Sequence, residues 1–300
     1  MRPLQAPPVV FLGGRFLATD EPPTVSLFDR GYLLGDSVFA SLRVWQGYPF
    51  AISRHLARFC ASALAVGIEV PDARALEAIA IEACARFRGD HGVLRVTVSR
   101  GEGGPGLAIG PAPSLEPTLS VVVREILAPP FAPPTAVRIA SLRAPPAACL
   151  DPSLKVGSYG ARVQMRREAE TFGNREAIVL GIRDEVVSGV ASNVFVLKKG
   201  VMRTPTLASG ARAGVTRELC MDLLATLAIP VLEARLERAD LRGAEALFFT
   251  SSVLPMLTAE SFEDVALDTS ASEIVALRGA FERTVAESRA APAHPPTVAR

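Results

Sequence analysis

The sequence is poor in lysine, although it is not poor in positive charge. It contains 32 lysine and arginine residues among 300, yet lysine stands only at positions 155, 198 and 199. Lys198 and Lys199 precede a glycine in the stretch KKG, which is typical of a solvated hairpin tip. Arginine stays protonated and forms no imine. A lysine kept at position 155, between a loop and an expected helix, therefore favours a reactive amine over a surface charge.

Cysteine is also scarce, which argues against a disulfide framework and against a zinc or other metal site. The 4 cysteines form no CxxC pair, and they are Cys60, Cys84, Cys149 and Cys220. No apolar run reaches the length of a signal peptide or of a membrane span. The net charge of +1 gives no bias toward nucleic acid or a membrane surface. We therefore expect a soluble, cytoplasmic protein.

The chain lacks a nucleotide-binding loop, although one segment imitates it. Gly101, Gly103 and Gly106 match GxGxxG directly after an expected strand. A dinucleotide site also needs a helix that begins after the glycines, whereas prolines follow here without helical periodicity. No Gly-Lys-Ser/Thr sequence completes a Walker A motif. We interpret RGEGGPGLAIGPAP as a loop, either over a site or on the surface.

A proline-rich stretch, LAPPFAPP, divides the chain and predicts an interdomain linker over residues 128–135. Residues 1–127 alternate hairpin-like strands and amphipathic helices, and they predict an N-terminal α/β lobe. Residues 136–287 again mix strands and helices and predict a second α/β lobe. The polar and proline-rich residues 288–300 predict a disordered tail.

Several boundaries in these lobes have specific signals. Hairpins are expected around Gly13-Gly14 and around Gln46-Gly47. One helix is expected to end at Gly67, and the next to begin after the capping residue Asp72. A third helix should end near Phe172, and a fourth should run from about Gly214 to Leu227.

Three segments of the chain suit a phosphate group, each with an ordinary alternative. Val215 and Thr216 begin an amphipathic helix after Gly214, so they can hold an anion or form an ordinary capped helix start. Arg58 is either an anion ligand or a solvated surface arginine. The polar run ending at Ser252 follows an apolar strand and is either a ligand contact or a turn. Together with an amine at Lys155, these donors point to an aldehyde cofactor that carries phosphate, namely pyridoxal 5′-phosphate (PLP).

Six segments between Phe11 and Leu257 share a further pattern in their order and spacing. They are DRGYLLGDSVFASLRVWQG, HLARF, SLKVGSYGARVQMRREA, VVSGVASNVFVLKKG, AGVTREL and FFTSS. Together they resemble the class IV aminotransferase family, the fold-type IV PLP enzymes. The resemblance implies an α/β (α+β) fold of two lobes, with a smaller N-terminal α/β sandwich and a larger C-terminal lobe with a β-barrel-like core. It also implies a homodimer that acts on a small amino-bearing substrate.

The resemblance assigns roles to individual residues. Lys155 stands where the family has its Schiff-base lysine, which also serves as the general base. Tyr159 is expected to contact the cofactor ring or its phenolic oxygen. The residues expected to bind the cofactor phosphate are Arg58, Val215, Thr216 and Ser252.

Ser188 departs from the family pattern. The family usually has a glutamate at this position, which pairs with the pyridine nitrogen of the cofactor. Ser188 offers only a neutral hydrogen bond, so protonation of the ring is less favoured and the ring is a weaker electron sink. Glu185 would lie on the opposite face of a strand and Asp184 roughly 13 Å along it, so neither replaces the missing acid. We expect slow transamination.

The subgroup within the family follows from two further segments. VSRGEGGPGL, which contains Arg100, resembles a loop of the aminodeoxychorismate lyases, although Pro105 stands where a basic residue is usual. Ala40 replaces an acidic residue of many transaminases, and Ser41 next to it supplies a hydroxyl. Ser41 and Arg100 are therefore the candidate substrate contacts.

These observations leave three hypotheses for the function. The first is an aminodeoxychorismate lyase-type reaction that releases p-aminobenzoate and pyruvate. The second is transamination of a D-amino acid or a branched-chain amino acid. The third is an impaired or non-catalytic PLP-binding homologue, which Ser188 keeps open.

Overall fold

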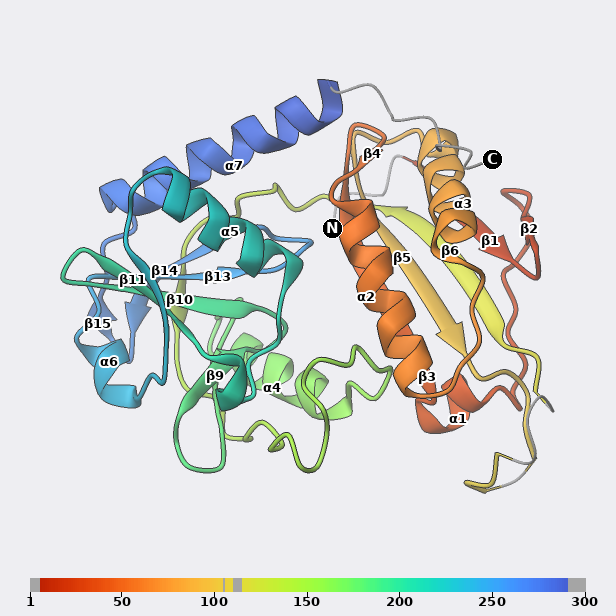
Figure 1. The fold of residues 1–300 in the computed structure, drawn as a ribbon, viewed down its shortest axis with the longest axis horizontal. Helices are drawn as coiled ribbons and strands as arrows, with labels where there is room; N and C mark the ends of the chain where they lie inside the picture. The colour runs from red at the N-terminus through yellow and green to blue at the C-terminus, as the bar shows by residue number, and fades with distance from the viewer. Residues whose placement is uncertain (1–5, 105, 110–114, 291–300) are drawn as a thin grey trace, which may run out of the picture.

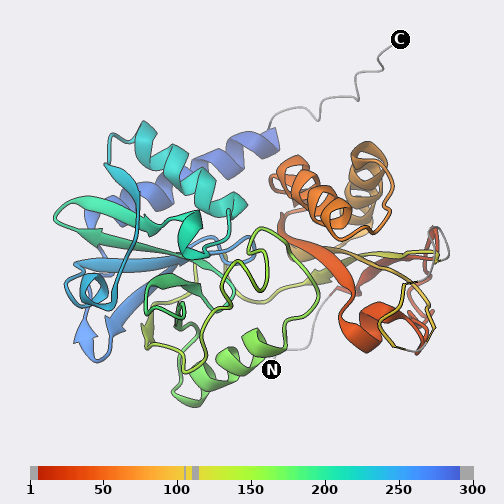
Figure 2. The same cartoon turned by 60° about the horizontal axis from the view of Figure 1, so that its bottom comes forward.

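The computed structural model describes residues 6–104, 106–109 and 115–290, and it consists of two lobes (Figure 1). The N-terminal lobe, red to yellow, and the C-terminal lobe, green to blue, lie side by side in both views (Figure 2). The expected two-lobed α/β class is therefore confirmed.

The N-terminal lobe is a six-stranded antiparallel sheet in the order β2-β1-β6-β5-β3-β4, with two long helices on one face. Alternate residues of β3, namely Val38, Ala40 and Leu42, are buried in the core under these helices. The strands are β1 (Val9–Leu12), β2 (Arg15–Phe16), β3 (Ser37–Trp45), β4 (Tyr48–Pro49), β5 (His91–Ser99) and β6 (Thr118–Glu125). The helices are α1 (Arg30–Leu34), α2 (Ile52–Ala65) and α3 (Ala73–Arg86).

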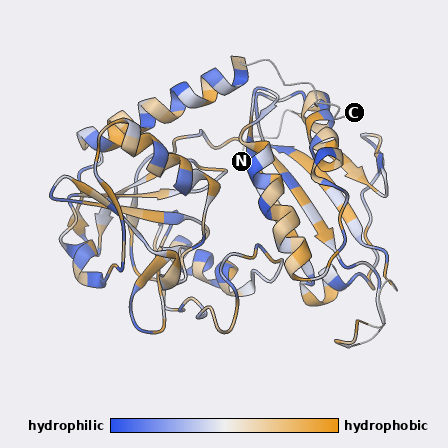
Figure 3. Ribbon diagram, in the orientation of Figure 1, coloured by the Kyte–Doolittle hydropathy of each residue, from blue (hydrophilic) through white to orange (hydrophobic). Residues whose placement is uncertain are grey.

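Helices α2 and α3 form where the apolar periodicity and the capping residues predict them. Leu56 and Phe59 of α2 are each 1% exposed, and burial of such a side chain contributes about 1.5–3 kcal/mol. The surface of α2 carries hydrophilic residues in its first half and hydrophobic ones in its second half (Figure 3). Gly67 adopts the left-handed φ of +66° after α2, and the Asp72 carboxylate accepts hydrogen bonds from the first N–H groups of α3.

The C-terminal lobe contains a sheet in the order β12-β11-β10-β13-β14-β15, to which β7 is added beside β14, and a separate β8-β9 pair. Helices α5 and α7 lie together on one side of this lobe (Figure 1). The strands are β7 (Thr135–Val137), β8 (Ile178–Leu180), β9 (Val186–Gly189), β10 (Asn193–Lys198), β11 (Val201–Pro205), β12 (Val231–Ala234), β13 (Ala246–Thr250), β14 (Leu257–Phe262) and β15 (Val265–Ala266). The helices are α4 (Gly160–Thr171), a 3-10 turn (Leu207–Ser209), α5 (Val215–Thr226), α6 (Arg238–Arg242) and α7 (Ser272–Ala290).

Strand β3 and the fully buried Arg43 join the two lobes. The Arg43 guanidinium donates to Val253 O at 2.9 Å and to Ala128 O at 2.8 Å, so it binds the C-terminal lobe and the linker together. The backbone N–H of Phe39, also on β3, donates to Lys155 O at 2.9 Å. The segment that carries Lys155 is therefore attached directly to the sheet of the other lobe.

Most of the expected boundaries agree with the structure, and two differ. Thr135 already belongs to β7, so the segment without helix or strand between β6 and β7 ends one residue before the predicted linker does. Helix α7 continues through Ala290, three residues into the predicted tail, because Val285 still packs into the core near its end. Residues 291–300 lie outside the described residues. No helix of the described residues is long and apolar enough to cross a membrane.

Candidate active site

Lys155 lies at the junction of the lobes, where three elements meet. Its carbonyl accepts from Phe39 of β3, and its N–H donates to Ser62 Oγ of α2 at 3.4 Å. Its Nζ lies 4.6 Å from the centroid of the Phe39 ring and 5.9 Å from that of Tyr159. The two rings themselves pack edge to face at 5.1 Å. The amine therefore lies against two aromatic rings rather than in bulk water.

The surroundings of Lys155 favour its neutral form. Burial, and after it the positive charges of Arg212, Arg95 and Arg162, together lower the pKa of the amine from 10.5 to about 7. All three charged groups that shift this pKa are arginines. A large share of the amine is thus unprotonated at neutral pH, which is the form that attacks a carbonyl.

Arg95 and Ser41 face the Lys155 side of the N-terminal sheet. They are direct cross-strand partners on β5 and β3, and the Arg95 guanidinium lies 3.8 Å from the centroid of the Phe39 ring. Ala40 points to the opposite face and is buried under the helices. Ala40 therefore does not line the site, whereas Ser41 lies beside a cation suited to a substrate carboxylate.

Arg212 holds the loop that carries Lys155. Its guanidinium donates to Leu154 O at 2.6 Å and to Ser153 O at 3.3 Å. The phenol of Tyr159 raises the pKa of Arg212 and also those of Arg95 and Arg162, so the Tyr159 oxygen lies among all three guanidinium groups, whose pKa values burial lowers. Tyr159 and the Lys155 amine therefore have the same three arginines as charged neighbours.

The beginning of α5 has the features expected of an anion site. Its N-cap is Gly214, which offers no side chain to its N–H groups, and buried Val215 and Thr216 follow. A Cβ at Gly214 would lie 2.2 Å from Asn193 Oδ1, so only glycine allows β10 to approach this closely. Helix N-terminal N–H groups without a side-chain cap attract phosphate.

Arg58 reaches the same helix start from the other lobe. Its guanidinium donates to Ala213 O and pairs with Glu218. Ser252 follows β13, whose Thr250 is paired with Asn193 of β10, so its segment converges on the same place. Arg58 of α2 and the start of α5 are thus brought together, while the phosphate contact of Ser252 stays a prediction.

Ser188 lies buried on β9 and is contacted by a residue that the sequence did not single out. Its hydroxyl donates to Gly189 O at 2.7 Å, and Arg162 Nη1 of α4 donates to Ser188 Oγ at 3.3 Å. Asp184 instead pairs with Arg143, and Glu185 accepts from the Arg183 N–H. Neither acid therefore takes the place of the missing glutamate.

The geometry argues against the substrate role expected for Arg100. This buried arginine donates to both Asp36 carboxylate oxygens, to Gly67 O and to Val66 O, each at 2.7–3.1 Å. Two of these bonds attach the end of β5 to the end of α2, and the other two attach it to Asp36, just before β3. The glycine loop that follows is held by Arg30, which donates to the carbonyls of residues 106–108, while Pro105 lies outside the described residues.

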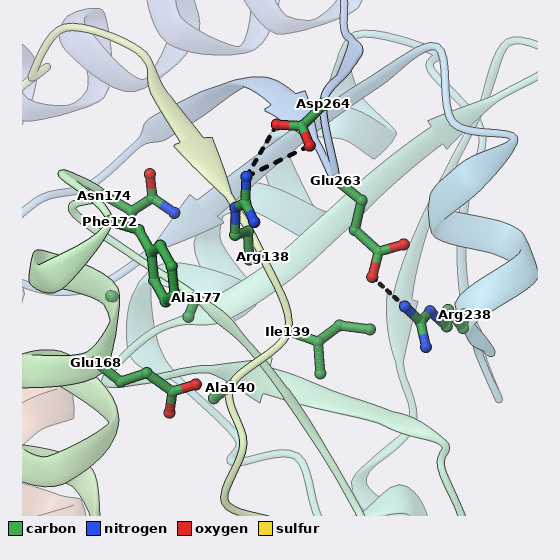
Figure 4. A pocket seen from close by; sticks show the side chains of 11 residues that line it. Arg138, Ile139, Ala140, Glu168, Phe172, Asn174, Ala177, Arg238, Glu263 and Asp264 are labelled. Atoms are coloured by element: carbon green, nitrogen blue, oxygen red, sulfur yellow. Dashed lines mark hydrogen bonds and ion pairs between the residues drawn. The ribbon is translucent and has the colours of Figure 1, made fainter.

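Two cavities of the C-terminal lobe do not contain Lys155. One, of about 390 Å³, is lined by two ion pairs, Arg138 with Asp264 and Arg238 with Glu263 (Figure 4). The other, of about 460 Å³, lies beside Glu176 and Ser251. The charges of the first are paired with each other and neither cavity contains a lysine, so Lys155 at the junction of the lobes stays the candidate site.

Sequence reasoning missed Arg95, Arg162 and Arg212. Arg95 gives a signal in retrospect, because it is a charged residue within the otherwise apolar and hydroxylic strand VLRVTVS. Arg212 stands two residues before Gly214, the N-cap of the helix start that was singled out as a phosphate site. Arg162 gives no such signal, since an arginine in the first turns of a polar helix is ordinary.

Comparison with known proteins decides the family. The family model described as amino-transferase class IV matches residues 37–262. The chain belongs to the class IV aminotransferases. Members of this family are PLP-dependent aminotransferases or lyases, so the chain is an enzyme of this kind and its cofactor is PLP.

The relatives of this class IV enzyme carry different names. A putative branched-chain-amino-acid aminotransferase of Methanocaldococcus jannaschii is 30% identical over 246 residues, 81% of this chain and 84% of the relative. A D-alanine aminotransferase of Listeria monocytogenes is 27% identical and covers 79% and 82%. An aminodeoxychorismate lyase of Bacillus subtilis is 24% identical and covers 86% and 87%. The substrate is therefore not shared among the relatives.

Solved structures show the same fold. A branched-chain aminotransferase of Thermoproteus uzoniensis superposes with a TM-score of 0.85 at 21% identity, over 94% of this chain and 96% of its own. An aminotransferase of Brucella abortus, described with bound PLP, superposes with a TM-score of 0.84 at 24% identity, over 93% and 99%.

The residues of the cleft fit PLP. A half-buried amine with a lowered pKa, an uncapped helix start and Arg58 match the aldehyde and the phosphate of this group. At the Ser188 end the fit is different, because a hydroxyl and a guanidinium stand there instead of an acid.

Proposed function

We propose that the enzyme is a PLP-dependent lyase of the aminodeoxychorismate type, which acts on an amino-bearing carboxylate and releases p-aminobenzoate and pyruvate. The observation that supports a lyase over a transaminase is the Arg162–Ser188 contact. Transamination needs a proton delivered to the cofactor, and this needs strong electron withdrawal by the ring. Elimination needs only that the electrons leaving the substrate α-carbon expel a leaving group. A site without a ring-nitrogen acid therefore suits elimination better.

PLP, when bound, supplies an aldehyde that combines with amines and a ring that withdraws electrons from the substrate. The Lys155 Nζ holds this aldehyde and, once displaced by the substrate amine, takes the α-proton as general base. Arg58, Val215, Thr216 and Ser252 bind the phosphate. Arg95 and Ser41 bind the substrate carboxylate, and Tyr159 lies against the cofactor ring.

Two properties of Lys155 support its role. Its lowered pKa provides a neutral amine for attachment, and its position over Phe39 directs the amine into the cleft. Arg212 keeps the Lys155 loop in place through two backbone carbonyls, so the amine returns to the same position after each turnover.

Product analysis tests the proposed reaction. We expect aminodeoxychorismate to yield p-aminobenzoate and pyruvate, without formation of a keto acid from D-alanine or branched-chain amino acids. The second candidate is a transaminase, which the similarity to the Methanocaldococcus jannaschii and Listeria monocytogenes proteins supports. Keto acid formation without p-aminobenzoate would establish this candidate instead.

Borohydride trapping tests the cofactor site that both candidates share. After reduction, we expect a phosphopyridoxyl group on Lys155 in a peptide mass spectrum and none on Lys198. The absence of any adduct and of cofactor absorbance would support a non-catalytic homologue.

We also propose that the protein is a cytoplasmic homodimer with a second copy covering an apolar patch beside the site. The patch comprises residues of α1 and the segment before it that are 41–70% exposed, namely Leu27, Phe28, Tyr32, Leu33 and Leu34. Light scattering after size exclusion should give twice the chain mass of 31.7 kDa, and Leu33→Glu should reduce it to the mass of one chain. A wild-type protein of single-chain mass would contradict the dimer.

A further inference from the structure

Arg162 is positioned by acceptors around Ser188. Its Nη1 donates to Val190 O at 3.0 Å, to Gly189 O at 3.2 Å and to Ser188 Oγ at 3.3 Å. Among the described residues, no acceptor is found for its Nε and Nη2, so these groups are available to donate to a ligand. The guanidinium also lies close enough to Lys155 to lower the pKa of that amine. Arg162 is therefore one of the charged groups that act on the Lys155 amine.

The hydroxyl of Ser188 has no hydrogen left to offer. It donates its proton to Gly189 O at 2.7 Å and accepts from Arg162. Only an oxygen lone pair next to a fixed positive charge remains. That lone pair is a poor partner for a further cation, because the guanidinium repels it.

The nearest acid is already used by other groups. Glu176 is 3% exposed, and its carboxylate accepts from the N–H groups of Ala177 and Val190 and from Ser192 Oγ, at 2.7–3.1 Å. Its second oxygen also pairs with Arg166 at 3.4 Å. These contacts hold the turn between β9 and β10, so Glu176 supports the backbone that Arg162 binds and does not face the cleft as a free acceptor.

We propose that Arg162 donates to the pyridine nitrogen of PLP and that this nitrogen is unprotonated in the resting enzyme. A guanidinium stays protonated and has donors only, so it matches a nitrogen lone pair and opposes an N–H⁺ group at the same place. The proposal deepens the proposed function, because it rests on PLP attached to Lys155 with its ring directed toward Ser188. Arg162, rather than the missing glutamate alone, then sets how strongly the ring withdraws electrons.

The ¹⁵N chemical shift of the holoenzyme, reconstituted with PLP labelled at the pyridine nitrogen, tests this directly. A free pyridine nitrogen and a pyridinium nitrogen give well-separated signals. We expect the wild-type signal at the free-pyridine position throughout pH 6–9. In Arg162→Gln combined with Ser188→Glu, an acid faces the nitrogen without the competing cation, and the signal should move to the pyridinium position. Arg167→Gln, on an exposed position of the same helix, should leave the wild-type signal unchanged.

Two results would overturn the proposal. One is a wild-type signal at the pyridinium position, and the other is a double-variant signal that stays at the free-pyridine position. The wild-type measurement needs no variant, so a variant that fails to fold does not weaken it. Borohydride trapping on the same labelled sample separates failure of the proposed function from failure of the inference about Arg162. An adduct on Lys155 with a pyridinium signal rejects only the role of Arg162. A sample without any adduct rejects the proposed function together with this inference.

Discussion

The two ends of the cofactor cleft both carry an arginine, yet they place it against opposite partners. At the α5 end, Arg58 lies at the uncapped helix start, and we propose that both bind the phosphate, which positive groups attract. At the β9 end, Arg162 lies against Ser188, where the resemblance to the family implies an acid. The first end matches the charge of the cofactor and governs its affinity. The second end opposes a proton on the ring and governs its reactivity, so changes at the two ends should affect different measurements.

Lys155 lies between these ends, and its loss should have the largest effect. Lys155→Arg keeps a basic side chain of similar length but removes the nucleophile and the base, so we expect product formation to fall roughly 10³-fold or more. Steady-state assays with PLP in excess measure this loss. The matched control Lys198→Arg changes a lysine that pairs with Asp240 on the surface of the C-terminal lobe and should retain full activity. Equal losses of product formation in both variants would contradict the catalytic role of Lys155.

The phosphate end is tested by Arg58→Gln, which should weaken PLP binding without preventing attachment. Loss of a charge-assisted hydrogen bond costs about 1.5–3 kcal/mol, which corresponds to roughly 10- to 100-fold in Kd. Titration of the apoenzyme with PLP, followed by absorbance, measures the change. Arg54→Gln on the same helix removes only an exposed contact of 3.9 Å with Asp222 and should change Kd little. A reduced turnover at unchanged Kd would show that Arg58 acts on the chemistry instead.

The two ends also differ in how well they could be predicted from the sequence. The phosphate end depends on local signals, such as a glycine before an amphipathic helix, and these were sufficient to single out Val215 and Thr216. The lobes and most helices likewise follow from periodicity and caps, as Asp72 and Gly67 illustrate. Roles of the individual site residues remain predictions.

The β9 end, called the nitrogen end because it is proposed to face the pyridine nitrogen, could be predicted from the sequence only in part, because tertiary contacts assemble it. Ser188 was visible as a departure from a family pattern, whereas Arg162 lies 26 residues away and reaches it from α4. Arg100 shows a related limit: its motif predicts a substrate contact, whereas the structure directs its donors to Asp36 and to the carbonyls that end α2, which the sequence did not indicate. The side-chain direction of an arginine depends on its acceptors, and those come from elsewhere in the chain.

The nitrogen end is tested kinetically by Ser188→Glu. A new carboxylate should increase ring protonation and speed up half-transamination in a single turnover, but Arg162 would pair with it and limit the gain to a few-fold. Ser188→Glu combined with Arg162→Gln should give about a tenfold increase, equivalent to about 1.4 kcal/mol. The Kd for PLP should stay within about twofold in both, because the phosphate end is unchanged. A double variant no faster than wild type in half-transamination would contradict the proposal that the end at Ser188 governs the reactivity of the cofactor ring.

The smallest expected effect is a shift in the pH at which PLP attaches to the apoenzyme. The neutral Lys155 amine is the attacking form, so the association rate should rise about tenfold per pH unit below about 7 and level off above it. Arg95→Gln removes one of the positive charges that lower this pKa, so the midpoint should move to higher pH.

The folded chain releases the Lys155 proton at about pH 7 and the unfolded chain near pH 10.5, so the unfolded state binds more protons between these values. The free energy of unfolding of the apoenzyme should therefore gain from Lys155 as pH rises through this window, and gain less in Arg95→Gln. Stopped-flow absorbance and urea unfolding at matched pH values measure the two effects, and a midpoint that moves to lower pH would show that Arg95 does not act on Lys155 through its charge.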